Sequence, residues 1–393
     1  IDTPTTESYT LSLHEALPIY EVYRWRTRCP VKQCRNHLLA NGCATYLELA
    51  AIENESADLV EEAHLFAEAS AMPPKESATQ HVFASASPKP PPHPGNGVIA
   101  SVEPERHITF MKATLEALTE EMEKNPSIFV LGEGIGQRGG NFASTTGLFE
   151  KYGPARLRDT PICERGFVGL ACGAAMGGAR PVVDFMFADF ILDAAGEIIN
   201  QIAKIQYMSS GRLKMPVLLR GCIGIGHSVA THHSGSYYSM YAQFPGLRVA
   251  VPSSPYDAKG LLKTALTCDD PVVFLEHREL LAVKGPVPAG AYSVPFGQAA
   301  VVREGTTVTV VALALMVHKT LEACEHLARK NILVELIDPR TVSPLDTETI
   351  LKSVAKTGRL LIVDESFGPC GIGAEIARSE ERRVGKECRS RWS

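Results

Sequence analysis

The sequence predicts an α/β protein in which a doubly wound parallel sheet is followed by a smaller α/β unit. From residue 107 onward, short apolar runs alternate with amphipathic stretches that are long enough to form helices. This alternation is typical of parallel strands whose sheet is covered by helices on both faces. A turn-rich crossing at about 285–298 interrupts the pattern, which then starts again and stops near residue 377.

The overall composition narrows the class of protein. The chain has 393 residues, which leaves room for more than one domain with a sizeable core. Hydrophobic residues make up 45%, charged residues 21%, and the net charge is −5, which is ordinary for a soluble protein. There is no basic surplus to suggest nucleic acid, and no apolar run approaches the ~20 residues that a membrane span needs. We therefore expect no nucleic acid and no membrane among the partners.

Cysteine usage indicates a reducing compartment. The ten cysteines are scattered, and no two of them form a C-x-x-C pair. A disulfide framework or a structural zinc site is therefore not expected. The first residues do not have the order of a signal peptide, so we expect a cytoplasmic location.

The first hundred residues differ from the rest in composition and in the spacing of apolar residues. Residues 20–70 have apolar residues at three- and four-residue spacing with acids between them, which predicts helices. Residues 71–106 contain MPPK and SPKPPPHPGNG, a composition that favours an extended, uncored linker. The two ends, 1–19 and 378–393, continue neither pattern, and we expect them to be non-native sequence.

The elements of the α/β region follow from periodicity and from turn residues. The first domain is expected to contain, in order, a helix at 107–126 with Thr109 as its N-cap, a strand at 127–134, a strand at 181–187, a long helix at 188–208, strands at 215–221 and 246–252, a helix at 256–268 and a strand at 271–277. The second domain is expected to contain a strand at 307–313, a helix at 316–330, a strand at 332–338, a helix at 346–357 and a strand at 359–366.

Several common chemistries find no support in the motifs. The glycine clusters at 132–140, 221–227 and 371–376 give no clean G-x-G-x-x-G after a strand with an acid about 20 residues on. No G-x-x-x-x-G-K-[ST] is present, so neither a nicotinamide site nor a P-loop is expected. Ser234 lies in no G-x-S-x-G motif, which leaves a hydrolase as a weak alternative.

Two clusters of polar residues remain open to more than one interpretation. Glu164 and Arg165 begin a run of glycine, alanine and small apolar residues within 159–178. The carboxylate suits either a helix N-terminus or a functional role in an apolar cleft. His232 and His233 follow a strand and a glycine-rich loop, a favoured place for chemistry in a parallel sheet, yet they suit plain hydrogen bonding equally well.

From Ile108 to Ala377 the chain resembles a known family, the beta subunit of the thiamine-diphosphate-dependent 2-oxo acid dehydrogenase decarboxylating component. The motifs that carry the resemblance include LGEGIG, KYGPARLRDTPICERGFVG, GAAMGGARPVVDFMFADF, HHSGSYY, PVVFLEH and VELIDPRTVSPLDTETI. The resemblance implies a thiamine-diphosphate-binding, transketolase-like pyrimidine-binding domain at 107–284 and a truncated transketolase C-terminal-like domain at 298–377. Residues 20–70 resemble the helical tail of the alpha subunit of the same family, which suggests an alpha–beta fusion.

The resemblance also implies a reaction and a set of partners. The reaction would be oxidative decarboxylation of a 2-oxo acid, with acyl transfer to lipoyl-lysine of the dihydrolipoyl acyltransferase. Pyruvate, branched-chain 2-oxo acids and acetoin all remain open as substrates. An alpha-subunit-like region would supply the Mg²⁺ and diphosphate contacts, because this chain lacks the G-D-G and asparagine motif that makes these contacts in the family. A second beta copy would complete the assembly. The alternatives are another transketolase-superfamily enzyme and a non-catalytic fragment or assembly module.

Site residues carry over from the family position by position. Glu164 would bond a ring nitrogen of the aminopyrimidine, with Ile162 and Phe190 as further cofactor contacts. His233 would face the reacting carbon and assist acyl transfer, and Glu133 would belong to a proton relay between paired active sites. A potassium ion would lie on the backbone oxygens of Val217, Ala265 and Leu266. At position 268, where the family has an aspartate ligand for this ion, the chain has a cysteine.

Overall fold

The computed structural model describes residues 23, 25–84, 106–226 and 228–384. The chain divides into two compact units, Ile1–Ser77 and Ala78–Ser393. The expected non-native segment 1–19, most of the expected linker and the last nine residues lie outside the described residues.

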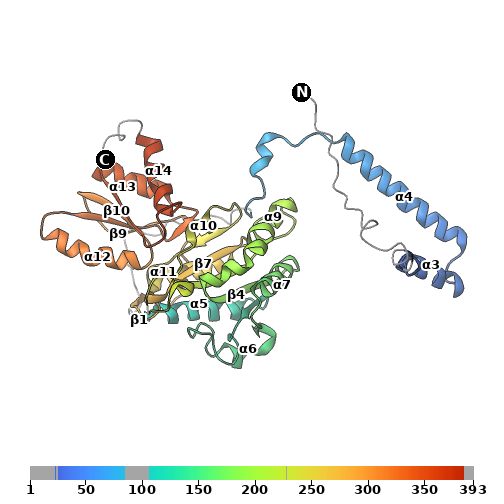
Figure 1. The fold of residues 1–393 in the computed structure, drawn as a ribbon, viewed down its shortest axis with the longest axis horizontal. Coiled ribbons are helices and arrows are strands. Elements are labelled where there is room, and N and C mark those ends of the chain that lie inside the picture. The colour runs from blue at the N-terminus through green and yellow to red at the C-terminus, as the bar shows by residue number, and fades with distance from the viewer. Residues whose placement is uncertain (1–22, 24, 85–105, 227, 385–393) are drawn as a thin grey trace. The chain divides into compact units, whose positions relative to one another are not determined.

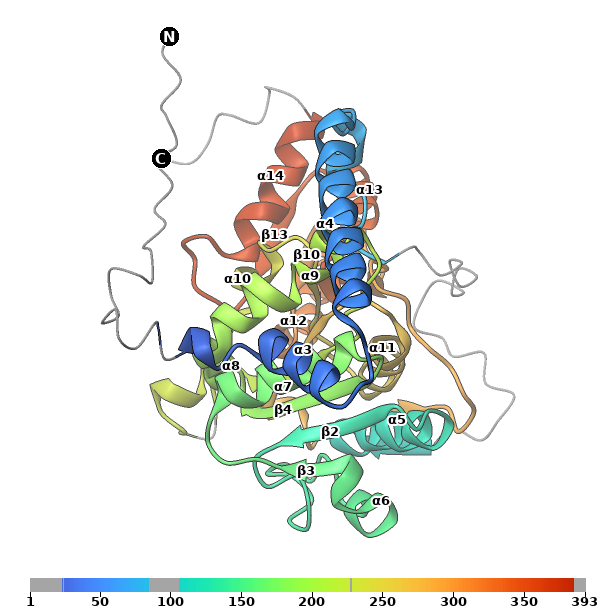
Figure 2. The ribbon, with the colours of Figure 1, turned by 90° about the vertical axis from the view of Figure 1, so that its right-hand side faces the viewer.

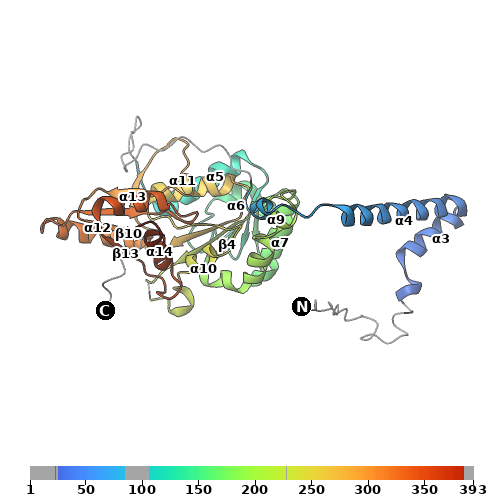
Figure 3. The same cartoon turned by 90° about the horizontal axis from the view of Figure 1, so that it is seen from above.

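The first unit includes α3 (Pro30–Ala40) and α4 (Tyr46–Ala69), which are joined by a short turn (Figure 3). Pro30 stands in the first turn of α3, where its missing N–H costs nothing. A capping box starts α4: Thr45 Oγ1 accepts the Glu48 N–H at 3.2 Å, and Glu48 Oε2 accepts the Thr45 N–H at 2.7 Å. The helices therefore form in the segment where periodicity predicts them.

Part of the expected linker is packed rather than extended. A 3-10 turn covers Lys75–Thr79, and the Ala84 N–H donates to the buried Asp270 carboxylate at 2.6 Å. The Phe83 ring lies 4.8 Å from the Arg248 guanidinium. The expectation of an uncored spacer is wrong for Phe83 and Ala84, because these two residues belong to the second unit and have partners within it.

The central sheet of the second unit has seven strands in the order β12-β6-β7-β5-β4-β2-β3 (Figure 1). All neighbours are parallel except β12, which runs antiparallel to β6. The strands are β2 (Ile128–Gly132), β3 (Leu157–Asp159), β4 (Arg180–Phe187), β5 (Leu218–Ile223), β6 (Arg248–Ala250), β7 (Val272–His277) and β12 (Thr341–Ser343).

Helices cover both faces of this sheet. Those on one face include α5 and α11, and those on the other include α7 and α10 (Figure 3). Neighbouring strand residues alternate between the two cores, since Val182 packs with α5 and α11 while Val183 packs with α7. The helices are α5 (Phe110–Lys124), α6 (Leu148–Arg156) beside β3 (Figure 2), α7 (Glu164–Met176), α8 (Ala188–Ile191), α9 (Ile205–Met208), α10 (Tyr238–Ala242) and α11 (Pro255–Thr267).

Within the second unit, the smaller C-terminal α/β domain, orange and red in Figure 1, has a sheet in the order β13-β10-β11-β9. Its strands are β9 (Ala300–Arg303), β10 (Val308–Ala312), β11 (Val334–Asp338) and β13 (Leu360–Val363). Its helices are α12 (Leu315–Ala328), α13 (Thr347–Thr357) and α14 (Ile372–Val384). The boundary expected at residue 377 falls inside α14. A separate ribbon pairs β1 (Arg106–Thr109) with β8 (Lys284–Val287).

Two local expectations have different outcomes. The Thr109 cap is confirmed, because its hydroxyl accepts the Lys112 N–H at 3.2 Å. The single long helix at 188–208 is wrong: α8, a 3-10 turn, a π-helical turn at Glu197–Ile202 and α9 replace it. Gly196, a weak helix former, stands directly before the π-helical turn. Within the described residues, no helix combines the length and apolarity needed to cross a bilayer.

Candidate active site

Four of the residues predicted for the site come from segments that follow strands at one edge of the central sheet. Glu133 follows β2, Glu164 begins α7 after β3, and Phe190 follows β4. His233 lies in the segment after β5. Because β2 to β5 are parallel, their carboxyl ends meet at the same edge, where ligands bind in sheets of this kind.

Glu164 is a buried carboxylate at the start of a helix. It is the first residue of α7 and retains only 9% of its exposed surface. Of the residues that the structure describes, none forms a hydrogen bond or ion pair with its carboxylate. The helix N-terminus interpretation is confirmed as a location, but the low exposure shows that this acid is not a solvated surface group.

Glu133 lies close enough to Glu164 for their charges to interact. Partial burial raises the pKa of Glu133, and the negative charge of Glu164 raises it further. The Asn141 side-chain amide donates to the Glu133 carbonyl oxygen at 3.1 Å and holds this turn. Glu133 therefore retains a proton to higher pH than an isolated glutamate would.

Arg165 is exposed and contacts the π-helical turn. Its Nε lies 3.0 Å from Glu197 Oε1, and this contact lowers the pKa of Glu197. The other carboxylate oxygen of Glu197 is buried and lacks a hydrogen-bond partner in the described part of the chain. The same is true of Thr160 Oγ1, which lies between β3 and α7, and of Asp189 Oδ2, which lies on α8 next to Phe190. Buried polar atoms of this kind indicate a missing ligand, water or partner.

An aromatic group surrounds His233. Its half-buried ring lies edge-on to Phe187 and Phe190, with centroid distances of 4.6 Å and 5.5 Å. Asp189 Oδ1 holds the loop that carries it, because it accepts the Gly235 N–H at 3.3 Å and the Tyr237 hydroxyl at 3.0 Å. Phe190 and His233, which lie far apart in the sequence, thus form one cluster.

Comparison with protein families and curated proteins identifies the class. Residues 106–284 match the family "Transketolase, pyrimidine binding domain", and residues 297–387 match "Transketolase, C-terminal domain". The chain is 44% identical over 282 residues to the acetoin:2,6-dichlorophenolindophenol oxidoreductase subunit beta of Cupriavidus necator, which covers 69% of this chain and 83% of that protein. It is 45% identical over 270 residues to the pyruvate dehydrogenase E1 component subunit beta of Rickettsia conorii, and 44% identical over 271 residues to the 2-oxoisovalerate dehydrogenase subunit beta of Bacillus subtilis, with the same coverage. The chain belongs to the E1 beta-subunit family of 2-oxo acid dehydrogenases.

A solved structure agrees with this assignment. The "Split gene transketolase, inactive beta4 tetramer" aligns with a TM-score of 0.60 and 25% identity, and the alignment covers 71% of this chain and 86% of that one. The transketolase-like fold expected from the resemblance is confirmed. The second family match also extends past residue 377, in agreement with the continuation of α14.

Ile162 and two polar residues considered from the sequence differ in exposure and in hydrogen bonding. Ile162 is 81% exposed, so the chain itself gives this side chain no enclosed pocket. His232 is exposed beside Thr231. The Ser234 hydroxyl donates to the Ala230 carbonyl at 2.7 Å, which does not suit a nucleophile. No cluster of three or more metal-ligating side chains occurs among the residues described.

The backbone oxygens predicted to hold potassium in this family already accept hydrogen bonds. The Val217 carbonyl accepts the Val272 N–H at 2.9 Å, and the Leu266 carbonyl accepts Arg180 Nε at 3.1 Å. The Cys268 thiol faces the Ala265 carbonyl at 3.7 Å, and burial raises its pKa to about 12. A neutral thiol is a poor ligand for a hard cation, so these residues fit potassium poorly.

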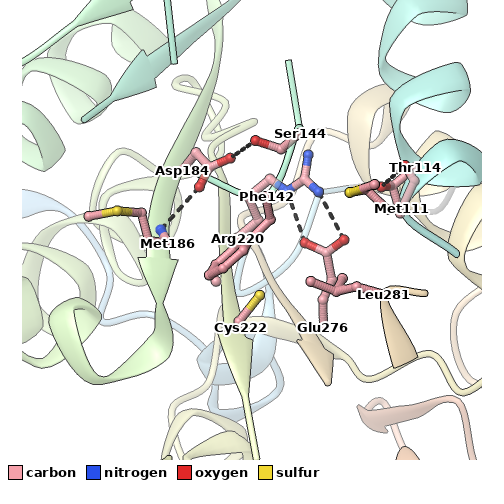
Figure 4. Close-up of a pocket in the computed structure, with 11 residues that line it drawn as sticks. Met111, Thr114, Phe142, Ser144, Asp184, Met186, Arg220, Cys222, Glu276 and Leu281 are labelled. Carbon is pink, nitrogen blue, oxygen red and sulfur yellow. Dashed lines mark hydrogen bonds and ion pairs between the residues drawn. The ribbon is translucent and has the colours of Figure 1, made fainter. Parts of the chain in front are cut away.

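Sequence reasoning missed a buried charged cluster beside the beta-subunit site (Figure 4). Arg220 on β5 forms two hydrogen bonds to Glu276 on β7, at 3.0 Å and 2.8 Å. Asp184 on β4 accepts the Ser144 hydroxyl at 2.7 Å. Burial raises the pKa of Glu276 against the lowering effect of Arg220. The available signal was a charged residue, Asp184, Arg220 or Glu276, within the apolar run of each of three strands.

Asp184 also holds a bend at the end of β4. Its Oδ1 accepts the Met186 N–H at 3.1 Å, and Met186 has a φ of 62°, a left-handed conformation that is strained for this residue (Figure 4). The register between β4 and β5 shifts between Asp184 and Phe187. Such irregularities redirect the side chains that follow. Here the following ring is Phe187, which contacts His233.

Proposed function

We propose that this chain is the beta part of a thiamine-diphosphate-dependent 2-oxo acid dehydrogenase that decarboxylates a 2-oxo acid and transfers the acyl group to lipoyl-lysine. The observation that carries the proposal is the buried Glu164 carboxylate, which has no partner among the described residues. An unpaired buried charge costs several kcal/mol, so a bound group with a complementary nitrogen is the simplest partner. The aminopyrimidine ring of thiamine diphosphate has that nitrogen.

The residues around Glu164 fit such a group. Buried polar atoms of Thr160, Asp189 and Glu197 lack partners in the described part of the chain, and the rings of Phe187 and Phe190 offer apolar faces. When bound, the cofactor supplies a nucleophilic thiazolium carbon and an electron sink for decarboxylation. Glu164 would hold a proton against the pyrimidine nitrogen, a role that low solvent exposure strengthens.

Glu133 and His233 have separate tasks in the proposal. Glu133, whose pKa is raised by burial and by Glu164, would accept and return a proton next to the cofactor glutamate. His233 would act on the acyl group at transfer, because its half-buried ring is held against Phe187 and Phe190 at the edge of the sheet. Both roles rest on the positions of these residues at the same edge of the sheet.

Magnesium and diphosphate contacts are assigned to an alpha-subunit-like region in the proposal. No step uses potassium, since the predicted carbonyl site fits that ion poorly. A cytoplasmic location is part of the proposal, and the cysteines of the described residues, which form no disulfides with one another, are compatible with it. The relatives act, by their names, on acetoin, pyruvate and 2-oxoisovalerate, so the substrate is proposed as this class of small 2-oxo compounds.

A second beta copy is the proposed partner of α7. A Cβ atom added to Gly169 or Gly173 would meet nothing within 4 Å, although both lie inside the helix. A glycine inside a helix lowers the stability of the helix by about 1 kcal/mol relative to alanine. Packing within this chain does not require a glycine at either position. A close helix contact with another subunit explains both glycines. The lipoyl domain and core of the acyltransferase complete the set of proposed partners.

The test uses the chain assembled with an alpha subunit of the family. Glu164→Gln should retain the fold, because the amide is nearly isosteric, while the exchange of the reactive cofactor proton with deuterium falls by about a hundredfold or more. Nuclear magnetic resonance of the quenched cofactor measures that exchange. Glu150→Gln, an exposed glutamate on α6, is the matched control and should exchange normally. Near-normal exchange in Glu164→Gln would contradict the proposal.

A further inference from the structure

The smaller C-terminal domain forms hydrogen bonds with residues 236–239, which follow His233 in the chain. The Ser236 hydroxyl donates to Glu365 Oε1 at 3.2 Å, and the Tyr238 hydroxyl donates to Asp364. The Ile372 N–H donates to the Ser239 hydroxyl at 2.9 Å. Three bonds to residues 236–239 therefore come from the segment that follows β13. Ser236 is 6% exposed, so its bond is shielded from water.

Glu365 is itself held by a buried histidine. His277, the last residue of β7, has no exposed surface, and its Nε2 lies 2.9 Å from Glu365 Oε1. The other ring nitrogen, Nδ1, accepts the Glu279 N–H at 3.1 Å. Since a backbone N–H can only donate, Nδ1 carries no proton, and the Nε2 proton points to Glu365. The first domain thus fixes the side chain of Glu365 in one orientation.

The start of the same loop is packed against this pair. A Cβ atom on Gly224 would lie 2.0 Å from His277 Nε2 and 2.6 Å from Glu365 Oε1, and its φ of 94° suits only glycine. The Gly224 N–H donates to the Gly235 carbonyl at 3.4 Å. The two ends of the loop that carries His233 therefore meet at the His277–Glu365 pair.

We propose that Glu365 of the C-terminal domain is a positioning residue for His233 in acyl transfer. It acts through Ser236 and Gly224, and His277 orients it. The inference rests on the proposed function, because it concerns the step in which His233 takes part. Among the described residues, His233 itself makes only ring contacts with Phe187 and Phe190 and one backbone hydrogen bond, from its N–H to the Ala230 carbonyl. The contacts of Gly224 and Ser236, on either side of His233 in the loop, therefore determine the position of the imidazole.

The test compares two rates in the assembled enzyme, decarboxylation coupled to a dye and acyl transfer to a free lipoyl domain. Glu365→Ala leaves the Ser236 hydroxyl and the His277 Nε2–H without their acceptor. Acyl transfer should fall about tenfold more than dye-coupled decarboxylation, which corresponds to about 1.4 kcal/mol. Glu365→Gln should restore transfer to within about threefold of the wild type, because both bonds end on one oxygen that an amide retains.

A combined variant separates positioning from a general loss of structure. In a His233→Ala background, Glu365→Ala should produce no further loss of acyl transfer. Ser236→Ala, which removes only the bond on the loop side, should reproduce part of the selective loss and serves if Glu365→Ala does not fold. Glu322→Gln, an exposed glutamate on α12, is the neutral control.

The outcomes that overturn the inference are distinct from failure of the proposed function. Equal losses in both rates, no rescue by Glu365→Gln, or an undiminished effect in the His233→Ala background would each show that Glu365 does not act through His233. Absence of cofactor-dependent decarboxylation in the wild-type assembly would instead reject the proposed function.

Discussion

Individual residues show how burial and neighbouring charges change the properties of side chains of the same type. Glu164 and Glu133 carry the same chemical group, yet burial and their mutual repulsion raise the pKa of Glu133. His277 is buried completely, whereas His232 is exposed. The residue type alone does not distinguish these cases, because the difference lies in solvent access and in the neighbouring charges.

Asp338 provides a residue-scale prediction on stability. Burial and the nearby charge of Asp257 raise its pKa to about 7. In the unfolded chain the pKa of an aspartate is about 3.9, so the folded state binds more protons between about pH 4 and pH 7. The free energy of unfolding should therefore fall as the pH rises through this window, by up to about 1.4 kcal/mol for each unit of pKa difference.

The variant that tests this is Asp338→Asn, which keeps an acceptor for the Arg340 N–H and removes the titrating group. As the pH rises from 4 to 7, the free energy of unfolding should fall in the wild type but not in Asp338→Asn, so the difference between the two proteins shifts in favour of the variant. Urea unfolding at pH 5 and pH 8 measures the difference, with Glu322→Gln as a surface control. The same pH slope in wild type and Asp338→Asn would contradict the assignment.

At the scale of elements, strands were easier to predict than their irregular ends. The apolar runs that became β2, β4, β5 and β7 are buried on both faces, which makes their sequences distinctive. The helix expected at 188–208 breaks instead into four pieces, because a π-helical turn and a 3-10 turn intervene. Such breaks depend on packing that local periodicity does not record.

The bend at the end of β4 carries an element-scale prediction. Asp184→Ala leaves the Met186 N–H and the Ser144 hydroxyl without their buried acceptor, which should cost about 2–4 kcal/mol of stability. Ser144→Ala removes one donor and should cost only about 1 kcal/mol. Chemical denaturation of both variants measures the two losses. Equal, small losses would show that Asp184 does not maintain the strained conformation of Met186.

At the scale of the whole molecule, the two α/β domains are joined through a shared sheet. Strand β12 comes from the C-terminal domain and pairs with β6 of the first. Arg340, just before β12, lies 2.8 Å from Asp257 on α11 as an ion pair, although the two groups are not aligned for a hydrogen bond. Such contacts place Asp364 and Glu365 where they reach the loop of His233.

The open glycines of α7 carry the prediction at this scale. Gly173→Leu has room within the chain and should leave the fold intact, but the side chain would block close approach of another helix. Light scattering after size exclusion should show the assembly with an alpha subunit reduced to a smaller species. Gly290→Leu, also in open space but in a turn, is the control. An unchanged assembly in Gly173→Leu would exclude α7 from the subunit contact.

The sequence by itself determined the fold class, the main strands and helices and the family, because apolar periodicity and ordered motifs are local properties of the chain. It also predicted Glu133, Glu164, Phe190 and His233 as site residues. Only the tertiary structure decided that Ile162 is exposed, that β12 joins the first sheet, and that Glu365 reaches the His233 loop. These features depend on contacts between residues far apart in the chain, and solvent access and hydrogen bonding there are set by the packed fold rather than by neighbours in sequence.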